Sequence, residues 1–531
     1  MRSDVPVRIW LTKGTQAIHP EQSGKWSAPF RATGVCFSGG STRSHAATVG
    51  QLRGLTETGL IDQVGYLSAV SGGAWATVPY VFYPSDAGVS SDRDILGSHR
   101  EPEDLSFDVL SELGQKSIGA AATNNFAEAL ALEYTDSAVA PAEVWIRAVG
   151  QTFLSPFGLY DPKDPLGFTF NESTLEEIRG RHATLRHLRL HTVSDLAYRP
   201  YLLVHSTLNW PSDEADLTRI NLVGFEYSPL GIGSGPSLTL QAGPVERAVG
   251  GGFVEPFAFG SPAPSNQADA SEFVKLTLPP TPFTLAHAIG ASSAFRMADR
   301  NLDMYPHDQY WPLSGKGRVA TPDVFTDGGD VENYGLLSLL RRGVTAIVVF
   351  INTMWPVSLE YRPSQWPTDL NASQPTRRSI DPFFAPLFGA PSTRFPHNQV
   401  FPETDYATVV SGLQQAKRLG GPVITTTKHI LESNAWWGID GGAEVEVCWC
   451  YNERVEQWAC RLPPLVRNLL RAGQADRPDG PFARFPHYLT RDQNPGALTQ
   501  LTAVQANLLA HLSCWNVIQY RDTLRRVLNR S

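Results

Sequence analysis

Short apolar segments that run into glycine-rich turns dominate the first eighty residues. Residues 34–37 and 66–70 are both apolar runs, and each leads into a Ser-Gly-Gly turn. Between them, every third residue from 46 to 55 is apolar, which predicts a helix with one buried stripe that stops near Gly59. A shorter helix that breaks near Pro79 is expected after the second turn. Repeated strand, glycine turn and helix predict an α/β fold with a parallel sheet.

The middle of the chain alternates between regular and irregular patterns. Residues 85–200 are heterogeneous, with some helical stretches, and we expect an insertion there that is a candidate lid. A strand resumes at residues 201–205, and the β-branched run over 344–351 predicts a central strand. Residues 355–403 are dense in proline and aromatic residues, which predicts a long irregular excursion.

The two ends of the chain carry weaker patterns. Residues 1–30 are mixed and polar, and we expect a short leader before the first strand. Residues 404–531 should form a C-terminal hairpin, with a strand over 443–451, and then helices. Because no internal repeat or linker divides the chain, we predict one domain over residues 1–531.

Composition and charge exclude several classes of protein. The 531 residues are 42% hydrophobic and 18% charged, as in a globular protein, and the net charge of -8 argues against a nucleic-acid partner. No apolar run follows the N-terminus, and the longest one, 344–351, is too short to span a bilayer. We therefore expect a cytoplasmic protein. The five cysteines suggest neither a disulfide framework nor a zinc site, and Cys448 and Cys450 should share one face of a strand.

Ser71 is the candidate nucleophile. A serine on a sharp strand-to-helix turn needs small residues two positions before and after it, because the turn is crowded. Ser71 has Ala69 and Gly73 at these positions, whereas the nearby Ser68 has Tyr66 and Val70. The following helix would also direct its N-terminus at the site and favour negative charge there.

The glycine-rich turn after the first strand can present backbone N–H groups to one point. Gly39, Gly40 and Ser41 are the candidate donors, and acyl transfer needs such donors because the carbonyl oxygen becomes an oxyanion. Arg43 follows directly and could orient a phosphate or carboxylate in a bidentate way. The alternatives are a plain turn and a surface salt bridge. A nucleotide-binding loop is disfavoured, because no Gly-Lys-Ser/Thr follows.

Asp327 is the candidate base. It ends a short apolar stretch, precedes two glycines and a Leu-rich helix, and so should be exposed at the end of a strand. A second Asp-Gly-Gly begins at Asp440, but it leads directly into a strand, where Asp-Gly predicts a hairpin turn. We therefore favour Asp327.

Together these three pieces resemble the patatin and cytosolic phospholipase A2 family. Its pattern is a glycine-rich loop with an arginine, a serine elbow and a late Asp-Gly-Gly, in this order. Residues 225–229, 259–261 and 290–295 are similar to further segments of the cytosolic phospholipase and lysophospholipase branch. This sequence departs from the family pattern at Ser41 and Ala69, where the family has glycine.

The resemblance implies a three-layer α/β fold with a mostly parallel central sheet, and a Ser–Asp dyad without histidine. It makes Ser71 the nucleophile, Asp327 the base, Gly39, Gly40 and Ser41 the oxyanion hole, and Arg43 the residue that positions the head group. The implied reaction is hydrolysis of a phospholipid or lysophospholipid ester, without a metal or cofactor. The implied partner is a membrane or micelle surface that the protein contacts transiently from the cytoplasm.

Two other functions are compatible with the sequence. An α/β-hydrolase esterase with a Ser–His–Asp triad could use His397, His429 or His487. A catalytically inactive lipid-binding protein on the same fold is the second alternative, and the changes at Ser41 and Ala69 motivate it. Acyl transfer to an acceptor other than water would use the same residues as hydrolysis.

Overall fold

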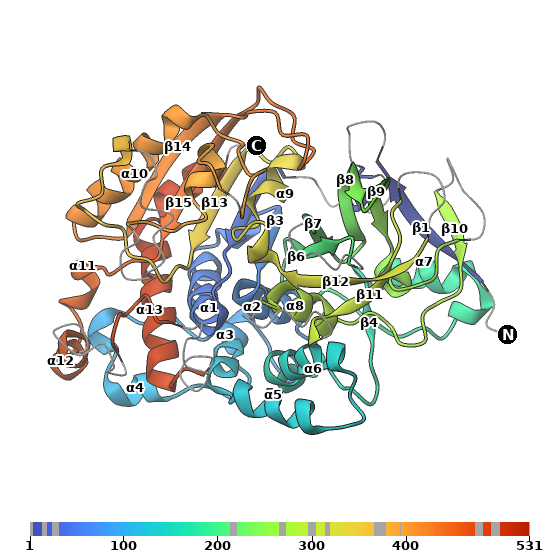
Figure 1. Cartoon of the computed structure of the whole chain (residues 1–531). Coiled ribbons are helices and arrows are strands. Elements are labelled where there is room, and N and C mark those ends of the chain that lie inside the picture. Colours follow the sequence, from blue (N-terminus) through green and yellow to red (C-terminus); the bar gives the residue numbers. More distant parts are fainter. Residues whose placement is uncertain are drawn as a thin grey trace.

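The computed structural model describes residues 4–12, 18–23, 31–85, 87–212, 220–264, 272–295, 304–313, 319–365, 379–392, 394–472, 482–489 and 500–529. Within these residues the fold is α/β, as predicted, and a 13-stranded sheet runs through it. Figure 1 shows this sheet extending from β14 at the left to β10 at the right.

Five neighbouring strands in the middle of the sheet run parallel. In spatial order they are β6 (Tyr201–Trp210), β3 (Tyr66–Val70), β2 (Thr33–Phe37), β13 (Ala346–Ile351) and β15 (Glu444–Tyr451). Nearly all of their residues are buried, as in parallel strands that are covered on both faces. Because β13 pairs with β2 and β15, the predicted central strand is confirmed.

Antiparallel strands extend the sheet at both ends. At one end β14 (Val423–Ile430) forms a hairpin with β15. At the other end follow β7 (Asn221–Tyr227), β8 (Ile232–Ala242), β9 (Val245–Val254), β1 (Val5–Leu11) and β10 (Phe273–Leu276). A further strand, β12 (Thr321–Asp327), pairs with β6 and with β11 (His307–Tyr310).

Alternate side chains of the central strands pack into two hydrophobic cores. On β15, Cys448 and Cys450 belong to the first core, whereas Val447 and Trp449 belong to the second, so both cysteines share one face as predicted. The first core is closed by α1 (Ser41–Glu57), α2 (Gly72–Phe82) and α14 (Arg521–Leu528). The second is closed by α9 (Leu336–Arg341) and α10 (Glu403–Arg418). The sheet is therefore the middle layer of three.

The remaining helices surround this three-layer centre (Figure 1). Within residues 85–200 they are α3 (Asp92–Leu96), α4 (Phe107–Ser111), α5 (Phe126–Thr135), α6 (Pro141–Phe153) and α7 (Glu172–Arg181), besides the short strands β4 (Gly167–Phe168) and β5 (Leu190–His191). Further along the chain are α8 (Leu285–Ser293), α11 (Glu456–Ala459), α12 (Pro464–Ala472) and α13 (Ala503–Gln519). Helix α6 packs between α5 and α8. The role of residues 85–200 as a lid stays a prediction.

The predicted leader contains a strand, which corrects the interpretation of residues 1–30. β1 lies between β9 and β10 and is antiparallel to both. Val5, Val7 and Ile9 alternate with more polar residues and are buried, which is the pattern of a strand with one face on the core. Strand β1 therefore forms part of the main sheet.

The helix after the second turn does not break at Pro79. Helix α2 continues to Phe82, and all of its residues are buried. A proline inside a helix removes one backbone hydrogen bond, but apolar contacts around the whole helix offset this loss. Helix α1 ends just before Gly59, as predicted.

In the described parts of residues 355–402, the backbone forms only two short 3-10 turns, Pro363–Gln365 and Ala385–Phe388. The other described residues of this stretch follow an irregular path over the second core, where Phe384 and Phe388 are fully buried. This segment reaches the candidate site described below.

Helices α1 and α13 are in close contact at Gly50. A Cβ atom at this position would lie 2.0 Å from the carbonyl oxygen of Ala510. We expect Gly50→Ala to force the helices apart and to lower the free energy of unfolding by about 1–3 kcal/mol, measured by urea unfolding. Gly180→Ala in α7 is the control, because nothing lies within 4 Å of its Cβ position. An equal loss of stability in both variants would contradict this account of the helix contact.

Candidate active site

Ser71 occupies the turn between β3 and α2 in a backbone conformation that is rare outside glycine. Its φ is 51° and its ψ is -121°. Such strain costs about 1–3 kcal/mol and is found mainly where function needs it. The turn is also crowded, because a Cβ atom at Gly72 would lie 2.0 Å from the carbonyl oxygen of Ser41 and one at Gly73 would lie 2.5 Å from that of Phe37. The Ser-Gly-Gly sequence is what permits this turn.

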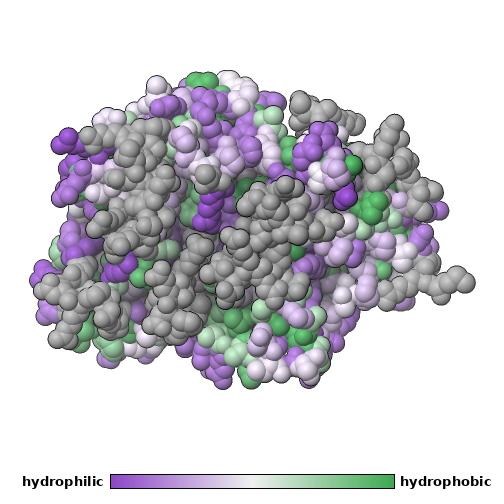
Figure 2. Space-filling view, in the orientation of Figure 1, coloured by the Kyte–Doolittle hydropathy of each residue, from purple (hydrophilic) through white to green (hydrophobic). Residues whose placement is uncertain are grey.

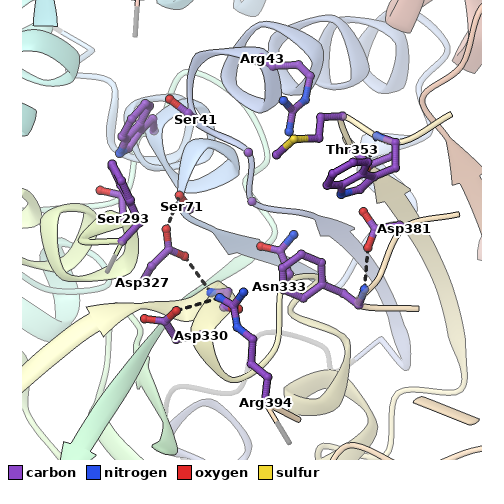
Figure 3. A pocket seen from close by; sticks show the side chains of 18 of the residues that line it. Ser41, Arg43, Ser71, Ser293, Asp327, Asp330, Asn333, Thr353, Asp381 and Arg394 are labelled. Carbon is purple, nitrogen blue, oxygen red and sulfur yellow. Dashed lines mark hydrogen bonds and ion pairs between the residues drawn. The ribbon is translucent and has the colours of Figure 1, made fainter. Parts of the chain in front are cut away.

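Strand β12 brings Asp327 to Ser71 across 256 positions of sequence. The Ser71 Oγ donates a hydrogen bond of 3.0 Å to Asp327 Oδ2 (Figure 3). The other carboxylate oxygen, Oδ1, accepts a bond of 2.8 Å from the N–H of Gly329. Because β12 pairs with β6, and β6 with β3, the sheet itself sets this juxtaposition. The two predicted residues are therefore adjacent, with the carboxylate held in one orientation.

The stretch 290–295, at the end of α8, holds the backbone of both residues. The N–H of Ser71 donates to Ser292 Oγ at 2.8 Å. The N–H of Asp327 donates to the carbonyl oxygen of Ala294 at 2.9 Å. Sequence analysis noted this stretch only through its resemblance to a family segment. Its hydrogen bonds now give Ser292 and Ala294 a positioning role.

Gly39, Gly40 and Ser41 lie between β2 and α1, beside Ser71. The predicted oxyanion role of Gly39 needs correction, because its N–H already donates to the carbonyl oxygen of Asn333 at 3.0 Å. What Gly39 provides is space: a Cβ atom there would lie 2.3 Å from Asn333 Oδ1 and 3.2 Å from Ser71 Cβ. Gly40 and Ser41 stay the predicted donors. Ser41 has a positive φ of 56°, which explains why glycine suits this position.

Two helices begin beside the Ser71 hydroxyl. Helix α1 starts at Ser41 and α2 at Gly72, where the two backbones are in contact. The first N–H groups of a helix have no partner within it, and the helix dipole makes this end positive. The two positive helix ends together favour negative charge at this point.

Arg43 lines the same pocket from the first turn of α1, but backbone carbonyls hold its guanidinium. Its Nε donates to Asn352 at 3.0 Å and its Nη1 to Tyr488 at 2.6 Å. The residue is only 2% exposed, so the alternative of a surface salt bridge is wrong. A Cβ atom at Gly40 would lie 2.5 Å from Arg43 Nη2. Arg43 thus braces the glycine loop, and its head-group role stays a prediction.

Ser71 and Asp327 open onto a pocket of about 750 Å³, counted with the space that is open to solvent. Aromatic side chains line part of it: Trp75, Trp145 and Phe295. Phe153 stacks on Trp75 with ring centres 4.1 Å apart, and Phe126 contacts the ring of Trp145 at 5.1 Å. This aromatic wall suits a hydrocarbon chain.

Charged side chains line another part of the pocket (Figure 3). Asp330 pairs with Arg394 at 2.9 Å. Asp381 accepts a hydrogen bond of 2.9 Å from the Tyr334 hydroxyl, and burial raises the pKa of Asp381 above its ordinary value. Sequence analysis missed all three. Asp330 belongs to the Asp-Gly-Gly turn and could have been considered, but Arg394 and Asp381 come from the irregular 355–403 segment, which carries no local signal.

The residues proposed for the alternative triad lie elsewhere. Among the described residues that line the pocket there is no histidine. His397, His429 and His487 instead contact Trp436, Asp405 and Glu453, respectively. Asp440 is exposed in the connection between β14 and β15. In the part of the chain that the structure describes, no cluster of three His, Cys, Asp or Glu side chains could hold a metal ion, and every helix is too short or too polar to cross a bilayer.

Comparison with known proteins shows only distant similarity. No family model and no curated protein matches this sequence. Human GIVD cytosolic phospholipase A2 is 12% identical with a TM-score of 0.45, and the match covers 94% of this chain and 60% of that chain. The same human protein in complex with methyl gamma-linolenyl fluorophosphonate is 14% identical, with a TM-score of 0.42 and coverages of 93% and 58%. VipD from Legionella pneumophila is 13% identical, with a TM-score of 0.22 and coverages of 64% and 53%.

The contact between Gly39, Asn333 and Ser71 can be tested directly. We expect Gly39→Ala to displace Ser71 and to slow its labelling by a fluorophosphonate probe about a hundredfold, since a shift of about 1 Å has this effect on a reactive group. Labelling rates followed by mass spectrometry measure the change. Gly114→Ala, with nothing within 4 Å of its Cβ position, serves as the control. Equal labelling of wild type and Gly39→Ala would show that the site tolerates the added methyl group.

Proposed function

We propose that this protein is a serine acyl hydrolase of the phospholipase or lysophospholipase type, which cleaves fatty-acyl esters of lipids. The observation that carries the proposal is the 3.0 Å hydrogen bond from Ser71 Oγ to Asp327 Oδ2 in a pocket with an aromatic wall. The strained turn at Ser71 supports it, because such a turn presents a nucleophilic oxygen away from the backbone.

In the first half of the reaction, Asp327 Oδ2 accepts the hydroxyl proton as Ser71 Oγ bonds to the ester carbonyl carbon. The carbonyl oxygen becomes an oxyanion beside the first turns of α1 and α2, with the N–H groups of Gly40 and Ser41 as proposed donors. The bond to the alcohol then breaks, and the proton on Asp327 passes to the departing oxygen. An acyl ester of Ser71 remains.

In the second half, Asp327 takes a proton from a water molecule as the water oxygen attacks the acyl carbon. The bond to Ser71 Oγ breaks, and the same proton returns to Ser71. A fatty acid leaves, and both residues regain their starting states. The bond from Gly329 to Asp327 Oδ1 keeps Oδ2 directed at Ser71 through both halves.

The pocket supports an amphiphilic substrate, a phospholipid or lysophospholipid. Its aromatic wall suits the acyl chain, and its charged part suits a polar head group. Leu132 and Tyr134 on α5 are exposed, and apolar side chains gather over α5 and α6 in the lower part of the view in Figure 2. Since Phe126 of the same helix packs behind the aromatic wall, we propose that this side of the protein contacts a membrane or micelle surface transiently.

The dyad makes a specific prediction for a fluorophosphonate probe. The adduct should form on Ser71 and be absent in Ser71→Ala. Asp327→Asn keeps the shape of the side chain but removes the base, so we expect labelling and ester hydrolysis to fall about 10²–10⁴-fold. Asp440→Asn is the matched control, because it changes the other Asp-Gly-Gly and should leave both rates unchanged.

Peptide mapping by mass spectrometry and hydrolysis of lysophospholipid micelles provide the two readouts. An adduct on another serine, or an equal loss in Asp440→Asn, would contradict the dyad. If no adduct forms even in the presence of micelles, the lipid-binding alternative becomes the better account of this fold.

The histidine-dependent alternative predicts a different result. If one of His397, His429 or His487 were the base, its replacement by alanine would lower the rate of hydrolysis about 10⁴-fold. We expect less than a fivefold change in kcat for each, because none of them lines the pocket. Steady-state kinetics of the three variants, each checked for folding by circular dichroism, tests this.

A further inference from the structure

Arg43 and Arg394 are the two guanidinium groups among the described residues that line the pocket, and they differ in their environment. Arg43 is almost fully buried and donates to the carbonyl oxygens of Asn352 and Tyr488. An arginine held in this way is costly to redirect, because each carbonyl would lose a charged hydrogen bond. Arg43 is therefore suited to bracing the glycine loop.

Arg394 is exposed in the same pocket. Its side chain is 43% accessible, whereas that of its partner Asp330 is 4% accessible. The pair thus presents its cationic side to solvent and its carboxylate to the protein interior. Figure 3 shows the side chain of Arg394 extending toward Asp330 and Asp327.

The hydrogen bonds of Arg394 leave part of its guanidinium available. Nη2 donates to Asp330 Oδ1 at 2.9 Å and to the carbonyl oxygen of Gly329 at 3.3 Å. No described residue accepts a hydrogen bond from its Nε or Nη1. The guanidinium also lies 5.6 Å from the ring centre of Phe383 and 5.1 Å from that of Phe395, which limits its motion. A guanidinium held at one nitrogen, with two nitrogens left to donate, matches the geometry of a phosphate group.

The position of Arg394 places such a phosphate close to the reacting atoms. Its partners, Gly329 and Asp330, are the second and third residues after Asp327 in one tight turn. A group bound by Arg394 is thus tied to the segment that carries the base. In a glycerophospholipid, only a few bonds separate the phosphate from the acyl ester, so both can occupy one pocket.

We infer that Arg394 forms an anion subsite for the phosphate of a phospholipid or lysophospholipid head group, and that it determines preference for phosphate-bearing over neutral acyl esters. This inference rests on the proposed function and deepens it. It also moves the head-group role from Arg43, where the sequence analysis placed it, to a residue of the irregular 355–403 segment.

The test compares kcat/KM for lysophosphatidylcholine and for a monoacylglycerol of the same chain length, both in neutral detergent micelles. The wild-type protein should prefer the lysophospholipid. In Arg394→Gln, the ratio of the two kcat/KM values should fall about ten- to a hundredfold, mainly through KM, as the loss of a charged hydrogen bond predicts. Arg394→Lys keeps the positive charge but lacks the planar guanidinium with its several N–H donors, and it should give an intermediate ratio.

Two further variants separate recognition from structure. Arg394→Gln with Asp330→Asn also removes the buried negative charge that pairs with Arg394, and its ratio should fall as in the single variant. Arg461→Gln removes an arginine of similar exposure that pairs with Glu103 and does not line the pocket, and its ratio should stay at the wild-type value.

If Arg394→Gln lowers both activities by the same factor and the ratio is unchanged, Arg394 only supports the fold, and the inference is overturned. A wild-type preference for the monoacylglycerol overturns it as well, whether or not the variants fold.

Inorganic phosphate distinguishes the source of the anion. Loss of lysophospholipid preference in Arg394→Gln, without phosphate inhibition of the wild type, identifies the lipid head group and supports the inference. The opposite result is that phosphate inhibits the wild type, that Arg394→Gln abolishes this inhibition, and that the ratio of the two kcat/KM values is unchanged. This result identifies free phosphate as the bound anion and overturns the head-group role. If the wild type hydrolyses neither ester and the probe does not label Ser71, the proposed function itself has failed. Labelling of Ser71 with an unchanged ratio rejects this inference alone.

Discussion

The close approach of two backbone turns at the carboxyl ends of β2 and β3 is the constraint on which the site depends. The turn at Ser71 is possible only because Gly72 lies against the backbone of Ser41 and Gly73 against that of Phe37. The same contact brings the first turns of α1 and α2 together, so two positive helix ends meet beside the Ser71 hydroxyl. Neighbouring parallel strands are about 4.8 Å apart, and only residues without side chains allow their turns to share this space.

The sheet completes the site from its other strands. β6 pairs with β3 through residues 201–205 and, further along the same edge, with β12 through residues 206–209, and β12 ends at Asp327. Asp327 is therefore placed by the same hydrogen-bonded ladder that carries Ser71, and the bonds from Ser71 and Asp327 to Ser292 and Ala294 lock both backbones to α8. Because the buried sheet fixes both residues, the Ser71 hydroxyl and the Asp327 carboxylate are aligned without further motion. Proton transfer between them would require this alignment.

The aromatic and charged parts of the pocket come from two kinds of structure. Its aromatic wall comes from α2, α6 and the end of α8, elements that also build the first core. Its charged part comes largely from the turn after β12 and from the irregular segment that includes Asp381 and Arg394. The apolar wall is thus fixed by the packing of the fold, whereas the polar groups lie on loops, where they can change without disturbing the core.

Local patterns in the sequence were enough to predict the α/β class, the central strand β13, the turn around Ser71 and the position of Asp327 at the end of a strand. Each of these features depends on residues that are close together in the sequence. Over such short distances the spacing of apolar residues, the glycines and the small neighbouring residues directly determine the backbone conformation. The strand at Val5–Leu11 was overlooked although its alternation was present, because a single short strand is stable only beside β9 and β10. The bond from Gly39 to Asn333, the burial of Arg43 and the pairing of Arg394 with Asp330 were decided by tertiary structure alone. These contacts join residues far apart in the chain. Local conformational preferences do not determine which distant group will accept a hydrogen bond from a given donor once the chain has folded.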